Sequence, residues 1–165
     1  MAREYELGAD INNAQGEAME KLARFCGDAE FAQPLYEVVR NWQNGDAFYY
    51  RMRFKSSFGG PFSGSAHHAV DLLFMFQTYN HVLPASQAAA AEEMGCHLIS
   101  FIKGLDPWKP YSEENNAMCY GPDTVNMIAK GEDGVGRYGL WDRFGREQDA
   151  WTRVSRHVRK EVIYV

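Results

Sequence analysis

The chain has 165 residues, of which 45% are hydrophobic and 24% are charged, and its formal net charge is −5. This composition is typical of a soluble globular domain of ordinary size. The acidic balance and the lack of a long basic run exclude the charge pattern of a nucleic-acid-binding protein. No apolar stretch reaches the roughly 18 residues that a membrane span needs. We therefore predict neither a nucleic-acid partner nor a membrane partner.

The three cysteines, Cys26, Cys96 and Cys119, lie far apart in the chain. An odd number of widely spaced cysteines argues against both a disulfide framework and a zinc site. Residues 1–12 contain several charges and no apolar core, so they do not resemble a secretory signal. We expect a cytoplasmic protein that uses no metal ion and no other cofactor.

Apolar residues at helical spacing predict two helices at the start of the chain, over Asn13–Phe25 and Ala29–Trp42. Gly27 and Asp28 fall between them. Asp28 is a residue type that commonly caps a helix N-terminus, so we predict that it caps the second helix.

A strand is predicted over Ala47–Phe54, because its residues alternate with a period of two. One face would carry Phe48, Tyr50, Met52 and Phe54, and the other face Tyr49, Arg51 and Arg53. A loop rich in Gly, Ser and Pro follows over Ser56–Ser65. It leads to His67 and His68, and a short amphipathic segment, Ala69–Phe76, comes next.

The clearest predicted helix covers Leu83–Leu105, with Pro84 at its start and Gly104 at its end. The remaining predicted elements are two short strands, Met118–Tyr120 and Val125–Ala129, and a helix, Tyr138–Lys160. Many helices with few strands indicate an α/β fold, and we predict a single domain over residues 1–165.

A histidine that follows a strand is a candidate for chemistry, since α/β folds place reactive groups at the carboxyl ends of their strands. An imidazole there can act as a general base near neutral pH. From the residue alone, an ordinary exposed loop histidine is the alternative. A metal cluster of His67, His68 and Asp71 is disfavoured because adjacent histidines seldom converge on one ion and no fourth ligand is evident. Asp71 is then expected to be a carboxylate that hydrogen-bonds near the loop.

The segment from Gly64 to Phe76 resembles the histidine motif of type-B carboxylesterases and cholinesterase-like enzymes. In that motif an acidic residue follows the catalytic histidine by three positions and a Phe follows it by eight. Here those places hold His68, Asp71 and Phe76. His67 is out of register by one residue, so the resemblance implies that His68 is the catalytic histidine.

Four further blocks resemble the same family, in the same order along the chain. They are Gly27–Pro34, Phe48–Phe54, Ile99–Tyr111 and Arg137–Asp142. The resemblance implies a truncated, C-terminal portion of an α/β-hydrolase fold, with few strands and mostly helices around them.

The chain also departs from the family. Ala69 replaces the glycine that usually follows the catalytic histidine, and Gln33 and Tyr138 replace a cysteine pair that many secreted members share. The nucleophile is normally a Ser in Gly-x-Ser-x-Gly between a strand and a helix. Gly60–Gly64 does not keep that spacing, so Ser63 is interpreted as a loop residue.

A Gly-rich oxyanion segment is absent too, and a general base without a nucleophile has nothing to activate. The first hypothesis is therefore a carboxylesterase-like fragment, inactive alone, that supplies His68 for hydrolysis of a small apolar carboxylic ester. Asp71, His67 and Ser63 are the candidates for supporting or binding roles. An N-terminal hydrolase half would be its partner.

Two alternatives stay open. The chain could be a free-standing, non-hydrolytic protein derived from an esterase, acting as an isomerase, a cyclase or a ligand binder through His68. It could also be a structural module that forms a homodimer.

Overall fold

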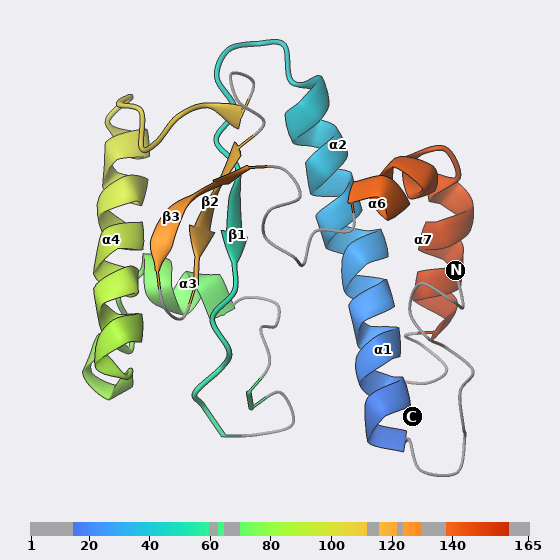
Figure 1. The fold of residues 1–165 in the computed structure, drawn as a ribbon, viewed down its shortest axis with the longest axis horizontal. Coiled ribbons are helices and arrows are strands. Elements are labelled where there is room, and N and C mark those ends of the chain that lie inside the picture. Colours follow the sequence, from blue (N-terminus) through green and yellow to red (C-terminus); the bar gives the residue numbers. More distant parts are fainter. Residues whose placement is uncertain are drawn as a thin grey trace. The chain divides into compact units, whose positions relative to one another are not determined.

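The computed structural model describes residues 15–59, 63–64, 70–111, 116–121, 124–129 and 138–158. The chain divides into two compact units: the first combines Met1–Asn41 with Arg137–Val165, and the second is Trp42–Gly136. Helices and a three-stranded sheet make this a mixed α/β protein, as the sequence predicts (Figure 1). The single domain over residues 1–165 stays a prediction.

The first unit begins with one continuous helical run instead of two separate helices. Helix α1 (Gln15–Gly27) passes into a π-helical turn, η1 (Asp28–Ala32), and then into α2 (Gln33–Asn41). Gly27 keeps right-handed helical angles, and the Gln33 amide donates to the carbonyl of Asp28. The predicted N-cap role of Asp28 is therefore wrong. The chain accommodates Gly27 and Asp28 with a wider turn, which keeps the helix unbroken.

The predicted helix Tyr138–Lys160 is two helices, α6 (Tyr138–Gly145) and α7 (Gln148–Val158). α6 ends where Gly145 lies against α2. A Cβ atom at this glycine would stand 2.6 Å from Glu37 Oε1 and 3.2 Å from Gln33 Nε2. An alanine here would have to displace the Glu37 carboxylate, and glycine is also a poor helix former.

Aromatic side chains form the centre of the first unit. Trp141 is completely buried, and its ring centroid lies 5.8 Å from that of Tyr36 and 5.0 Å from that of Tyr138. The guanidinium of Arg40 also contacts the carboxylate of Asp142 at 2.5 Å. The contact between Trp141 and Tyr36 and the ion pair between Arg40 and Asp142 both join α2 to α6.

The second unit is built on a sheet with the strand order β1-β2-β3. Strand β1 (Tyr50–Met52) runs parallel to β2 (Asn116–Tyr120), and β2 pairs antiparallel with β3 (Val125–Ala129) (Figure 1). The two predicted short strands are confirmed and pair as a hairpin, in which β2 starts two residues earlier than expected. β1 is shorter than the predicted strand Ala47–Phe54, although backbone bonds to β2 continue on both sides of it.

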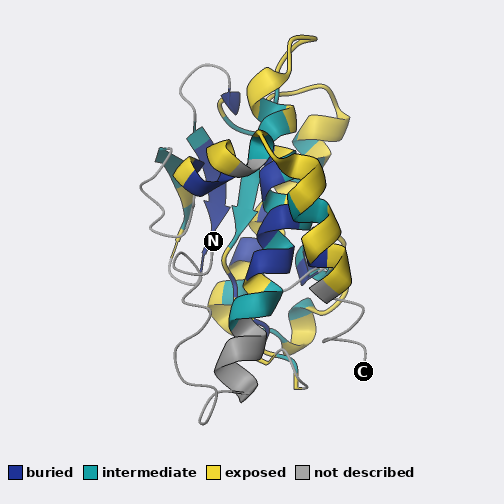
Figure 2. Ribbon diagram, turned by 90° about the vertical axis from the view of Figure 1, so that its right-hand side faces the viewer, coloured by how far each residue is buried: buried dark blue, intermediate teal, exposed yellow. Residues whose placement is uncertain are grey.

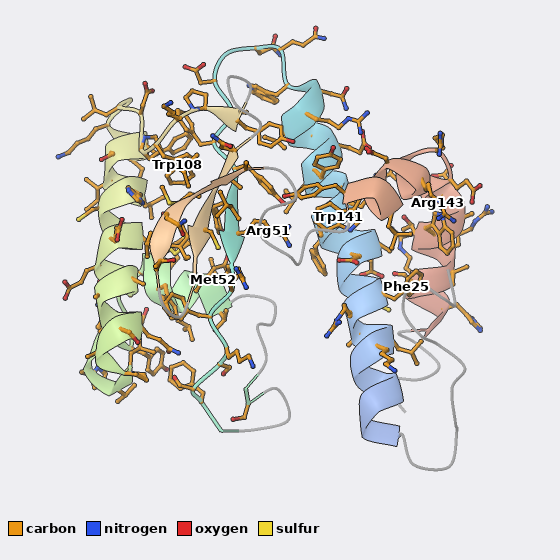
Figure 3. All side chains as sticks on the ribbon, in the orientation of Figure 1. Phe25, Arg51, Met52, Trp108, Trp141 and Arg143 are labelled. Atoms are coloured by element: carbon orange, nitrogen blue, oxygen red, sulfur yellow. The ribbon has the colours of Figure 1, made fainter. Side chains whose placement is uncertain are left out.

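Helices α3 (Val70–Met75) and α4 (Ala85–Ile102), with the short 3-10 helix η2 (Asn80–Val82) between them, pack against this sheet. Their side chains and those of the sheet share one apolar cluster. Its buried members are Phe54, Val70, Phe74, Ala90, Ala91, Met94, Met118 and Tyr120. Met52 belongs to its margin, whereas the neighbouring Arg51 points to the opposite face of the strand (Figure 3). Burial along the helices varies with the side that each residue faces (Figure 2).

The ends of α4 confirm the sequence prediction. Pro84 precedes the first residue, and the Gly104 amide donates to the Phe101 carbonyl while the Leu105 amide donates to the Ser100 carbonyl. These two bonds form a Schellman motif, which needs the left-handed φ of +71° that Gly104 adopts. None of the helices within the described ranges is both long and apolar enough to cross a bilayer.

Candidate functional site

His67 and His68 lie outside the described residues, so the catalytic role of His68 stays a prediction. The described chain leads to them from both sides. It leaves the carboxyl end of β1 at Arg53 and resumes at Val70, the first residue of α3. What the structure describes of the candidate site is therefore the segment on each side of the two histidines. These segments are the loop residues before them and the first turn of α3 after them.

The loop after β1 closes on a buried serine. Ser56 is only 6% exposed, its carbonyl accepts a 2.9 Å hydrogen bond from the Gly64 amide, and its hydroxyl accepts one from the Phe58 amide at 3.3 Å. Gly64 has a φ of +79°, which favours glycine. Ser63 precedes it in an exposed turn, not at a strand-to-helix elbow.

The same loop is bonded to α4. The Ser57 hydroxyl donates to Gln87 Oε1 at 3.3 Å, and Gln87 Nε2 donates to the Lys55 carbonyl at 3.3 Å. The Phe58 ring lies edge-on to Tyr79, with 5.4 Å between the centroids. These contacts hold the described part of the loop against α4 and the segment that precedes it.

Asp71 joins the first turn of α3 to the edge of the sheet. The Tyr50 hydroxyl, on β1, donates a 2.7 Å hydrogen bond to Asp71 Oδ2. Burial raises the pKa of the Tyr50 phenol well above its ordinary value, and the hydrogen bond to the Asp71 carboxylate raises it further. Tyr50 is therefore a permanent donor, and the residue three positions after His68 is held by a strand.

A second histidine, His97, was missed by sequence reasoning. Its Nδ1 atom lies 2.6 Å from the Tyr120 hydroxyl, and its ring lies edge-on to Trp108 at a centroid distance of 5.3 Å. Trp108 is close to the C-terminal end of α4 (Figure 3). Burial lowers the pKa of His97, and the negative charge of Glu93 acts in the opposite direction by raising it. Its spacing of three residues from Met94 on the apolar side of α4 could have identified it as an inward-facing histidine.

The described residues show no other site around the predicted ones. Within them, no group of three or more His, Cys, Asp or Glu side chains could hold a metal ion. An open groove of about 310 Å³ lies in the first unit, between η1 and α7, and neither Ser63 nor Asp71 lines it. No protein-family model, curated protein or solved structure matches the chain.

Proposed function

We propose that this chain is the C-terminal part of a carboxylesterase-like α/β-hydrolase and supplies its catalytic histidine, His68, for hydrolysis of carboxylic esters. The observation that carries the proposal is the hydrogen bond from Tyr50 to Asp71. It anchors the chain immediately after the histidines to a strand that runs parallel to its neighbour. Open α/β sheets bind their ligands at the carboxyl ends of the strands, and a general base must be held within hydrogen-bond reach of the proton that it takes.

In the proposed mechanism, His68 takes the proton of a serine hydroxyl as the serine attacks the ester carbonyl. The same imidazole then returns the proton to the leaving alcohol. The serine, its acid and the oxyanion donors come from a separate hydrolase half. Among the described strands, β1 has a neighbour on one side only, so the sheet could be extended next to it. Small apolar esters are the proposed substrates.

The proposed enzyme works in the cytoplasm. Support comes from the two positions at which many secreted carboxylesterases have a pair of cysteines. They hold Gln33 and Tyr138, and both side chains are buried in the first unit.

The test has two parts. The purified chain is first mixed with an activated ester and with a serine-reactive phosphonate, and we expect neither turnover nor label. The complex that co-purifies with the chain from its own cells is then assayed in the same way. It should hydrolyse the ester, with the phosphonate on the other polypeptide.

The variant His68→Gln should reduce that activity about 1,000-fold, the scale of a lost general base. The neighbouring variant His67→Gln is the matched control and should leave most of it. A labelled serine in this chain, or full activity of His68→Gln, would contradict the proposal.

A free-standing, non-hydrolytic protein is the second candidate. It is favoured by the apolar cluster of the second unit, whose described members all belong to that unit. Sedimentation would distinguish the candidates, because a lone stable monomer favours this one and a stable dimer favours a homodimeric module. A non-hydrolytic reaction lost in His68→Ala would establish it.

A further inference from the structure

The contact between His97 and Tyr120 is the strongest unassigned feature of the second unit, and it is independent of ester hydrolysis. His97 lies on α4, and Tyr120 is the last residue of β2. Their 2.6 Å hydrogen bond therefore joins the longest described helix directly to the middle strand of the sheet. Trp108 covers the pair, with its ring edge-on to both of the other rings.

The surroundings decide which atom donates. Tyr120 is only 1% exposed, and no other described atom hydrogen-bonds to its hydroxyl. A buried hydroxyl needs an acceptor for its hydrogen. The neutral imidazole provides one at Nδ1, so the Tyr120 O–H donates and His97 Nδ1 accepts.

Protonation of His97 removes this acceptor. Nδ1 then carries a hydrogen, the bond has to reverse, and the buried phenol hydrogen has no described acceptor to turn to. We propose that the His97–Tyr120 pair is an acid-sensitive contact that fastens α4 to the sheet at neutral pH and loosens it as the pH falls.

The other groups around the pair fit this role. Glu93, one turn earlier on α4, is the charged group that acts on both His97 and Tyr120. Trp108, from the segment after α4, brings no charge, and Tyr120, from β2, brings a phenol whose pKa is raised by burial. Among the described residues, Glu93 is thus the group that favours the imidazolium, and burial outweighs it, so the pKa of His97 is lowered from its ordinary value of 6.5.

The direction of the effect follows from linkage. The unfolded chain has a histidine of ordinary pKa, near 6.5, and binds a proton more readily than folded His97 does. The contact therefore contributes its full stability above that value. The contribution is lost as the pH falls from about 6.5 through the lower pKa of the folded state.

The experiment compares the unfolding temperature of the full chain at about pH 7.5 and about pH 5, on either side of the histidine range. The variant His97→Gln keeps an acceptor for Tyr120 but cannot be protonated. Between the two pH values, we expect the unfolding temperature of the wild type to fall by about 3 °C more than the unfolding temperature of His97→Gln. His81→Gln, at an exposed histidine of the same unit, is the matched control and should behave as the wild type does.

NMR titration of the wild-type imidazole gives a second result that requires no variant. We expect His97 to lack a hydrogen on Nδ1 at neutral pH and to titrate below 6.5. Protonation of Nδ1 at neutral pH would overturn the proposal. So would equal temperature shifts in wild type and His97→Gln.

Discussion

At the scale of single residues, two tyrosine hydroxyl groups that act as donors connect the elements of the second unit, one half-buried at Tyr50 and one buried at Tyr120. Tyr50 and Tyr120 lie on adjacent strands with their rings edge-on, 6.0 Å apart. One hydroxyl is bonded to Asp71 at the start of α3 and the other to His97 on α4. Each helix that covers the sheet is thus joined to it by one tyrosine, and the two bonds differ in charge. The bond to a carboxylate is the stronger kind.

The variant Tyr50→Phe should lower the free energy of unfolding by about 2 kcal/mol, because it leaves the half-buried Asp71 carboxylate without this donor. Denaturation in urea measures the change. Tyr79→Phe is the matched control, because the exposed Tyr79 hydroxyl makes no hydrogen bond to the described part of the chain. It should change stability by less than about 0.5 kcal/mol.

A double-mutant cycle with Asp71→Ala isolates the bond itself, because alanine leaves no acceptor for the Tyr50 hydroxyl. A coupling energy near zero between the two positions would contradict the role assigned to Tyr50.

At the scale of elements, glycines decide where helices end and how closely they approach. Gly104 ends α4 through its left-handed backbone, and Gly145 ends α6 where it meets α2. Gly139 has neither role. It lies within α6, and a Cβ atom there would meet nothing within 4 Å. Three glycines near helix ends or within helices therefore have three different consequences for substitution.

The pair Gly139→Ala and Gly145→Ala tests this distinction within one helix. Gly139→Ala should stabilise the chain by roughly 0.5–1 kcal/mol, since alanine is the better helix former and the site is open. Gly145→Ala should lose that gain and destabilise the chain by about 1 kcal/mol, because the new methyl group displaces Glu37 from its position beside Arg40.

Thermal unfolding of both variants provides the measurement. A stabilising effect at both positions would show that α6 does not approach α2 as closely as described.

At the scale of the whole molecule, the two compact units do not follow one another along the sequence. The first unit takes its helices from both ends of the sequence, while the second is one continuous segment. Each unit buries its own side chains: Trp141 and Tyr36 in the first, and the apolar cluster around Met118 in the second. Separate cores allow the stability of one unit to change without that of the other.

Trp141→Ala tests this independence. Removal of a fully buried Trp should cost about 4 kcal/mol, a large part of the stability of an ordinary domain. We expect amide hydrogen exchange to accelerate in α2 and α6, with protection in α4 kept. Equal loss of protection in both units would favour the predicted single cooperative domain over residues 1–165.

Local signals were sufficient for several elements. Pro84 and Gly104 mark the ends of α4 because proline lacks an amide hydrogen and glycine tolerates a positive φ, and both properties act within one turn of chain. The hairpin of β2 and β3 and the α/β class follow in the same way from alternation and helical spacing. The histidine motif is also local. The family resemblance selects His68 over His67 by its distance along the chain from Asp71 and Phe76, and this choice stays a prediction.

The tertiary structure decided what depends on residues far apart in the sequence. The contact of Gly145 with α2 and the hydrogen bond of His97 to Tyr120 each depend on a neighbour from another element. The bond of Asp71 to Tyr50 links residues 21 positions apart. Sequence periodicity indicates which side of an element is apolar. It does not indicate which polar atom of another element a side chain will hydrogen-bond to. The sequence thus determined the fold class and most of the elements and supplied a candidate histidine, whereas packing determined which polar groups hold the elements together.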